Sequence, residues 1–252
     1  MNVWAISDLH LSFARPDRRD RYAARWRDHA LQIGTHWRAR VRHGDLVLLP
    51  GDLSMARNHR DVQPDLVWLD KLPGTKVLAP GNHDQWWNGA QKIRPMLRDT
   101  MLAVDGDAIE SHGVIVCGAA GAAPAYDPAS DDERQAVERG LLALGRALEA
   151  AELIRQNQGA PLYVLWHYPP FDAHGQPGPC VELFEQYGVT ACVYGHLHGE
   201  KEWSAAVQGL RQGIRYHCVA ADAVGFCPLR IEGLPEGQAE PRSGGLDIPG
   251  VR

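Results

Sequence analysis

Five short apolar runs dominate the sequence, and each is followed at once by polar residues that can bind a metal ion or transfer a proton. The runs occupy residues 3–6, 46–49, 76–79, 162–166 and 191–194. They show no alternation of apolar and polar residues, which is typical of β-strands covered on both faces. In open α/β sheets, ligands bind beyond the carboxyl ends of such strands. The sequence therefore predicts an α/β protein whose polar strand ends meet at one crevice.

The spacing of apolar residues between these runs indicates helices. Residues 20–42 and 131–158 carry apolar side chains at helical intervals in a polar background, which predicts two amphipathic helices. A shorter helix is expected to begin at residues 63–65, because Pro64 suits the first turn of a helix.

Two further apolar runs complete the expected domain. Residues 114–117 and 214–219 fit additional strands, the second with alternating polarity. No repeat or linker divides the chain, so we expect one domain over residues 1–232. Residues 233–252 are rich in Gly, Pro and Glu and predict an extended tail.

Composition excludes several classes of function. The 252 residues carry a net charge of −5, so the chain lacks the broad basic field that stable nucleic-acid binding needs. No stretch approaches the ~20 consecutive apolar residues of a membrane span, and no basic segment followed by an apolar run opens the chain. The five cysteines are scattered and odd in number, which favours reduced, buried thiols. We expect a soluble cytoplasmic protein that does not bind membranes. The sequence does not determine its oligomeric state.

Five motifs with chemically useful side chains follow the five apolar runs. They are Asp8-x-His10, Gly51-Asp52, Gly81-Asn82-His83-Asp84, the single His167, and Gly195-His196-x-His198. Each motif alone is more often a turn, a helix cap or a pair of surface residues than a site. Their joint occurrence in this order is what indicates a common function.

This ordered set resembles the calcineurin-like metallophosphoesterase family over residues 8–198. The resemblance implies an α/β fold of the α+β type, a two-sheet β-sandwich flanked by helices, with residues 1–232 as the catalytic domain. It also implies two metal sites that share Asp52 as a bridging ligand. One metal would be held by Asp8, His10, Asp52 and His198, and the other by Asp52, Asn82, His167 and His196.

The ligand set that the resemblance implies would hold two divalent or trivalent transition metal ions. Mixed nitrogen and oxygen donors suit Mn, Fe, Zn or Co rather than Mg or Ca. Two dications against two carboxylates leave a positive site that attracts a phosphate anion. The resemblance implies attack on phosphorus by a metal-bridging hydroxide, with His83 as the catalytic residue that assists the leaving group. Asp84 is expected to orient the His83 ring.

The substrate is less sharply defined by the sequence. Trp86, Trp87 and Tyr168 flank the motifs and, together with Asn82, are the expected substrate contacts. We expect a small phosphorylated substrate, either a phosphomonoester or a phosphodiester, with nucleotide-like compounds favoured. A phosphoprotein phosphatase and a non-catalytic scaffold of the same fold are the alternatives. Residues 118–128 are either a lid or a long surface loop, a choice that the sequence leaves open.

Overall fold

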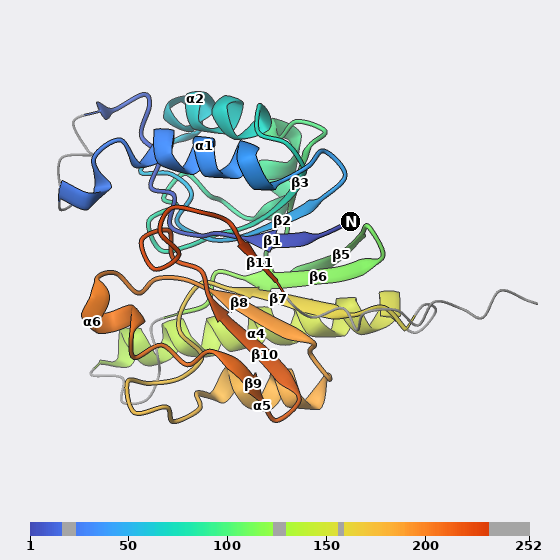
Figure 1. The fold of residues 1–252 in the computed structure, drawn as a ribbon. Coiled ribbons are helices and arrows are strands. Elements are labelled where there is room, and N and C mark those ends of the chain that lie inside the picture. The colour runs from blue at the N-terminus through green and yellow to red at the C-terminus, as the bar shows by residue number, and fades with distance from the viewer. Residues whose placement is uncertain (17–23, 123–129, 156–158, 232–252) are drawn as a thin grey trace, which may run out of the picture.

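Two stacked β-sheets with helices on both outer faces form the protein in its computed structural model (Figure 1). The structure describes residues 1–16, 24–122, 130–155 and 159–231. The predicted fold class, a two-sheet sandwich flanked by helices, is confirmed. Among the described residues, no helix combines the length and the apolar character needed to cross a bilayer.

The first sheet has five strands and is parallel apart from one edge. In spatial order its strands are β11 (Leu229–Arg230), β1 (Val3–Ala5), β2 (Leu46–Pro50), β3 (Thr75–Ala79) and β4 (Met101–Ala103). Strands β1 to β4 run parallel, and β11 pairs with β1 in the antiparallel sense. The carboxyl ends of β1, β2 and β3 therefore lie at one edge.

The second sheet has six strands with a parallel centre. In spatial order they are β5 (Asp107–Ser111), β6 (Val114–Ala119), β7 (Leu162–Trp166), β8 (Ala191–Tyr194), β10 (Ile214–Cys218) and β9 (Gly209–Arg211). Strands β6, β7, β8 and β10 are parallel, while β5 and β9 are antiparallel edges.

Alternate side chains of each central strand enter two different cores. In β2, Leu46 and Leu48 pack between the sheets, whereas Val47 and Leu49 face the helices. Tyr163 and Val164 divide in the same way in the second sheet. Because both faces are covered, both sets of positions are apolar, which explains the absence of alternation in the sequence.

The longer helices cover the outer faces of the sandwich (Figure 1). Helices α1 (His29–Arg40) and α2 (His59–Asp70) pack on the first sheet, and α4 (Asp131–Arg155) and α5 (Pro179–Gln186) pack on the second. The short helices are η2 (Ala24–Trp26), α3 (Ala90–Ile93), η3 (Arg94–Met96) and α6 (Glu200–Trp203).

Two predicted helix starts are wrong. The first long helix begins at His29 rather than near residue 20, because Asp28 has a left-handed backbone (φ 57°) that interrupts the helix. Helix α2 begins at His59, since the Asn58 side chain accepts hydrogen bonds from the backbone N–H groups of Arg60 and Asp61. Pro64 therefore lies inside the helix instead of opening it.

Some predictions concern residues that the structure does not describe. The predicted tail, residues 233–252, lies outside the described residues, and so does most of the predicted loop at 118–128. Residues 118 and 119 belong to β6. All five cysteines are described and free, and four of them are buried.

Candidate active site

The polar residues that follow both sheets meet at one edge of the sandwich. The backbone joins the sheets there, because Ser7 beyond β1 donates its N–H to the carbonyl of Val219 beyond β10 (2.9 Å). The first sheet supplies the motif residues Asp8, His10, Asp52, Asn82 and His83, and the second supplies His167, His196 and His198.

One cluster of possible metal ligands forms around Asp8, His10 and His198, whose donor atoms all lie within 4.8 Å of one another. The Nε2 atoms of His10 and His198 are 3.2 Å apart. Asp8 Oδ1 lies 3.4 Å from His198 Nε2 and 3.9 Å from His10 Nε2. Two imidazole nitrogens and a carboxylate oxygen thus converge on one point.

A second cluster contains Asp8, Asp52 and His167 within the same 4.8 Å limit. Asn82 joins it, because its Oδ1 lies 2.9 Å from His167 Nε2 and 3.1 Å from His196 Nδ1. All seven predicted ligands are therefore brought together. Which carboxylate is shared by two metals, Asp52 or Asp8, stays a prediction.

The residues present fit metal ions. Asp52 Oδ2 is buried and accepts no hydrogen bond from any described residue, although it lies 3.5 Å from His167 Nε2 and 3.8 Å from His10 Nε2. Such an oxygen is costly in a folded protein unless a cation compensates it. The oxygen and nitrogen donors around it match transition metals of borderline softness.

Charges inside the cluster keep its carboxylates ionised. Burial would raise the pKa of Asp52, but the neighbouring His167 holds that pKa below its ordinary value. Burial is likewise outweighed at Asp8 by His198 and His167, which lower the pKa of the carboxyl. Ionised carboxylates are the form that binds metal.

Left-handed backbone conformations concentrate in this cluster. Asp8, His10, Asp52 and His196 have φ angles of 56°, 42°, 52° and 71°. Non-glycine residues adopt this region at a cost of order 1–3 kcal/mol, and such strain gathers at functional sites. The strain is evidence for a site that is independent of the sequence motifs.

Groups beyond the ligands orient the histidine rings. The carbonyl of Pro50 lies 3.0 Å from His167 Nδ1, and Asp222 Oδ1 lies 3.1 Å from His198 Nδ1. Both contacts leave Nε2 facing the cluster. The pairing of Asp222 with His198 was not predicted, because 24 residues separate them and no motif links them.

Comparison with known proteins assigns the chain to a family. Residues 1–200 match the calcineurin-like phosphoesterase family. The chain belongs to that family. A search of curated proteins found no match.

Solved structures share the fold of this calcineurin-like phosphoesterase at low sequence identity. Phosphopantetheinyl hydrolase (PptH) from Mycobacterium tuberculosis is 14% identical, with a TM-score of 0.50, 94% of this chain covered and 97% of the other. TT1561 of Thermus thermophilus is also 14% identical, with a TM-score of 0.50 and 92% and 98% covered. At this identity the likeness shows the fold alone.

His83 and Asp84 have different surroundings in this calcineurin-like phosphoesterase. The His83 side chain is 45% exposed, and its Nε2 lies 4.0 Å from Asp52 Oδ2, at the rim of the cluster. The expectation that Asp84 orients the His83 ring is wrong. The buried Asp84 carboxylate instead accepts hydrogen bonds from the backbone N–H groups of Leu53, Ser54 and Gly81 and from Trp86 Nε1. It fastens the loop after β2 to the loop after β3.

Asp84→Asn should therefore lower stability. In either orientation the asparagine amide would place its NH₂ group against N–H donors, and each unsatisfied buried donor costs about 1–3 kcal/mol. We expect urea denaturation to show a loss of that size or larger. The control Glu149→Gln, on an exposed position of α4, should change stability by less than about 0.5 kcal/mol. Unchanged stability in Asp84→Asn would contradict the fastening role.

Glycines let the ligand loops approach each other closely. A Cβ at Gly81 would lie 2.2 Å from Asp52 Oδ1, and one at Gly195 would lie 2.1 Å from Asp8 Oδ2. Neither position tolerates a side chain unless a ligand carboxylate moves.

Gly81→Ala should accordingly displace Asp52 and lower metal affinity. The added methyl group also meets the backbone nitrogen of Asp52 at 2.4 Å, so rotating the carboxylate alone does not relieve the clash. We expect calorimetric titration with Mn²⁺ to show weaker binding by at least about tenfold, the lower end of the effect of disturbing groups that support ligands. Gly44→Ala is the matched control, since nothing lies within 4 Å of its added Cβ. Equal Mn²⁺ affinity in both variants would contradict this account.

The predicted substrate contacts divide into buried and accessible residues. Trp86 is fully buried, and its Nε1 is bound to Asp84, so the expectation that it stacks on substrate is wrong. Trp87 is partly exposed and donates its Nε1–H to Asp105 (3.0 Å). Tyr168 is partly exposed and lies against His196, with 4.5 Å between ring centroids. Trp87 and Tyr168 remain predictions as substrate contacts.

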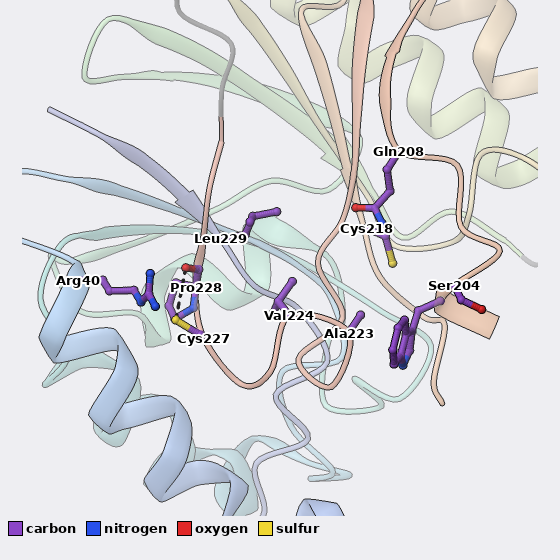
Figure 2. Close-up of a pocket in the computed structure, with 10 residues that line it drawn as sticks. Arg40, Ser204, Gln208, Cys218, Ala223, Val224, Cys227, Pro228 and Leu229 are labelled. Atoms are coloured by element: carbon purple, nitrogen blue, oxygen red, sulfur yellow. Dashed lines mark hydrogen bonds between the residues drawn. The ribbon is translucent and has the colours of Figure 1, made fainter. Parts of the chain in front are cut away.

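A hollow of about 450 Å³ opens near the segment that carries Asp222 (Figure 2). Ala223 and Val224, which directly follow Asp222, line it together with Arg40 and Cys227. None of the predicted ligands lines this hollow. It is therefore separate from the ligand cluster.

Proposed function

We propose that the protein is a phosphohydrolase that uses two transition metal ions to cleave a small phosphomonoester or phosphodiester. The observation that carries the proposal is the pair of adjacent clusters of oxygen and nitrogen donors, which include the buried Oδ2 of Asp52. This oxygen accepts no hydrogen bond from the described part of the chain. Family membership supports a metal-dependent phosphoesterase in general.

The residues divide into ligands and a proton donor. One metal would be held by Asp8, His10, Asp52 and His198, and the other by Asp52, Asn82, His167 and His196. Bound there, the metals would polarise phosphate oxygens and activate water as a nucleophile.

His83 would act on the leaving group. Its side chain is exposed at the rim, within 4.0 Å of Asp52, and so can reach a bound ester. A proton held at Nε2 would pass to the departing oxygen. Asn82 is exposed beside it and would contact the phosphate as well as a metal.

The accessible aromatic residues favour a substrate with a flat or apolar group. Trp87 and Tyr168 are both partly exposed and can contact such a group, and nucleotide-like compounds fit this description. One solved structure of the same fold is described as a phosphopantetheinyl hydrolase, so esters of phosphopantetheine belong among the compounds to test.

A substrate panel tests the proposal. Protein stripped with EDTA and resupplied with Mn²⁺ would be assayed on a nitrophenyl monoester, a bis-nitrophenyl diester, a cyclic nucleotide, a phosphopantetheine ester and a phosphopeptide. We expect Mn²⁺-dependent hydrolysis of at least one small ester and none after EDTA. Asp52→Asn, purified identically, controls for contaminating phosphatase.

Two outcomes would contradict the proposal. Hydrolysis of the phosphopeptide alone would make the protein a phosphoprotein phosphatase. Failure to bind metal, with no turnover of any compound, would make it a non-catalytic member of the fold.

A further inference from the structure

Trp26 lies outside every motif, yet it packs against histidines of the cluster. We propose that it is a positioning residue that orients His10 and His198 for one metal and leaves the other metal position unaffected. The inference rests on the proposed function, since it assumes that these histidines bind metal.

The indole of Trp26 contacts both rings edge-on. Its ring centroid lies 5.7 Å from that of His10 at an interplanar angle of 65°, and 5.5 Å from that of His198 at 71°. Trp26 is only 6% exposed. One rigid, buried side chain thus limits the rotation of two histidines whose Nε2 atoms are 3.2 Å apart.

Trp26 is itself held from several directions. Its backbone carbonyl lies 2.9 Å from His29 Nδ1, and its ring packs edge-on against Phe226 at 5.2 Å. The adjacent Arg25 donates from Nη2 to the backbone carbonyl of Asp222 (2.7 Å). The short helix η2 is therefore hydrogen-bonded to the segment that carries Asp222, the partner of His198.

His198 is consequently fixed by two groups with separate tasks. Asp222 lies against Nδ1 and sets which nitrogen faces the cluster, while Trp26 fills the space beside the ring. Truncating Trp26 would leave a void next to both histidines and let their rings turn away from a shared metal.

The other cluster has its own aromatic neighbour. Tyr168 packs against His196 at 4.5 Å and against His167 at 5.3 Å. Each proposed metal position therefore has one aromatic side chain against two of its histidines. This division predicts that the effect of Trp26 is confined to one position.

Calorimetric titration with Mn²⁺ tests the inference in backgrounds that keep one position each. His196→Ala removes a ligand of the second position and leaves the His10 and His198 position. His198→Ala does the reverse. Adding Trp26→Ala should weaken Mn²⁺ binding about 10–100-fold in the first background, the range for groups that orient ligands. In the second background the affinity should stay within about twofold, a result that also shows the double variant is folded.

A second substitution separates ring contact from volume. Trp26→Phe keeps an aromatic ring in place and should recover most of the affinity that Trp26→Ala loses. Trp68→Ala is the matched control, because its ring packs against Phe13 in the same core rather than against a proposed ligand. It should lower stability without changing Mn²⁺ affinity.

The outcomes separate this inference from the proposed function. Equal weakening in both backgrounds would make Trp26 a general structural residue and overturn the inference, and so would unchanged affinity in both. Wild-type protein that binds no Mn²⁺ would instead contradict the proposed function and remove the basis of the inference with it.

Discussion

Replacing Asp52 with asparagine should leave the protein folded, remove both metals and reduce turnover to background. Asparagine keeps an Oδ1 that can accept the backbone N–H of His83, which in the wild type lies 2.8 Å from Asp52 Oδ1. Only Oδ2 is exchanged, and that atom faces His10 and His167, one histidine from each proposed position. Its NH₂ substitute carries no negative charge and cannot coordinate. Metal affinity should fall more than about 100-fold, since disturbing groups that merely support ligands already costs about 10–100-fold.

Elemental analysis after dialysis measures the effect. Asp8→Asn is the comparison. In the structure Asp8 lies in both clusters of possible ligands, whereas the motif pattern predicts that it binds only one metal. If Asp52 is the shared ligand, Asp52→Asn should lose two ions and Asp8→Asn one. The reverse ranking would make Asp8 the shared ligand, and two tightly bound ions in Asp52→Asn would contradict its role altogether.

His83→Ala should retain both metals and lose about 10²–10⁴-fold in kcat for an ester with a poor leaving group, the usual contribution of general acid catalysis. His83 is the one motif histidine that the two proposed ligand sets do not use. Its exposed ring at the rim leaves room for substrate next to Nε2. An alkoxide needs a proton to depart, whereas nitrophenolate departs without one. The penalty should thus be large for an alkyl ester and small for a nitrophenyl ester.

Steady-state kinetics on a matched pair of alkyl and nitrophenyl esters measures this difference, with metal content checked in the same samples. His59→Ala is a suitable control, because His59 begins α2 outside the ligand cluster and is paired with Asn88 Nδ2 (3.2 Å). It should leave kcat for both esters unchanged. A uniform loss in His83→Ala would assign the residue to phosphate binding, and lost metal would make it a ligand.

The sequence predicted the centre of the fold better than its edges. Strands β7 and β8 have the predicted bounds, and β1, β2 and β3 differ from them by one residue. These strands are buried on both faces, so burial leaves a continuous apolar run in the sequence. The strands β4, β5, β9 and β11 were not predicted. These strands are two to five residues long and form the edges of the two sheets, so they are specified mainly by the strands with which they pair.

In the site, too, residues next to predicted strands were predictable, whereas contacts made through tertiary packing were not. The seven predicted ligands come from loops that directly follow strands. Parallel pairing brings the loops of one sheet together, and stacking of the two sheets brings the two sets of loops together. The partners of those ligands depend on tertiary packing instead. Trp86 adjoins a motif yet points into the core, while Asp222 and Trp26 reach the cluster from segments with no motif. No pattern of spacing in the sequence encodes these contacts.

The origin of the ligands in two sheets has a consequence for the order of assembly. Each proposed metal position draws on the loops of both sheets, so neither half of the chain holds a complete set of ligands. A nascent chain that has formed only β1 to β4 of the first sheet would bind metal weakly, and firm capture must wait until the second sheet has stacked on them. Once bound, each ion would link ligands from both sheets and slow the separation of the sheets. Metal that binds only the native state stabilises that state. Acquisition of the cofactor would then mark the end of folding.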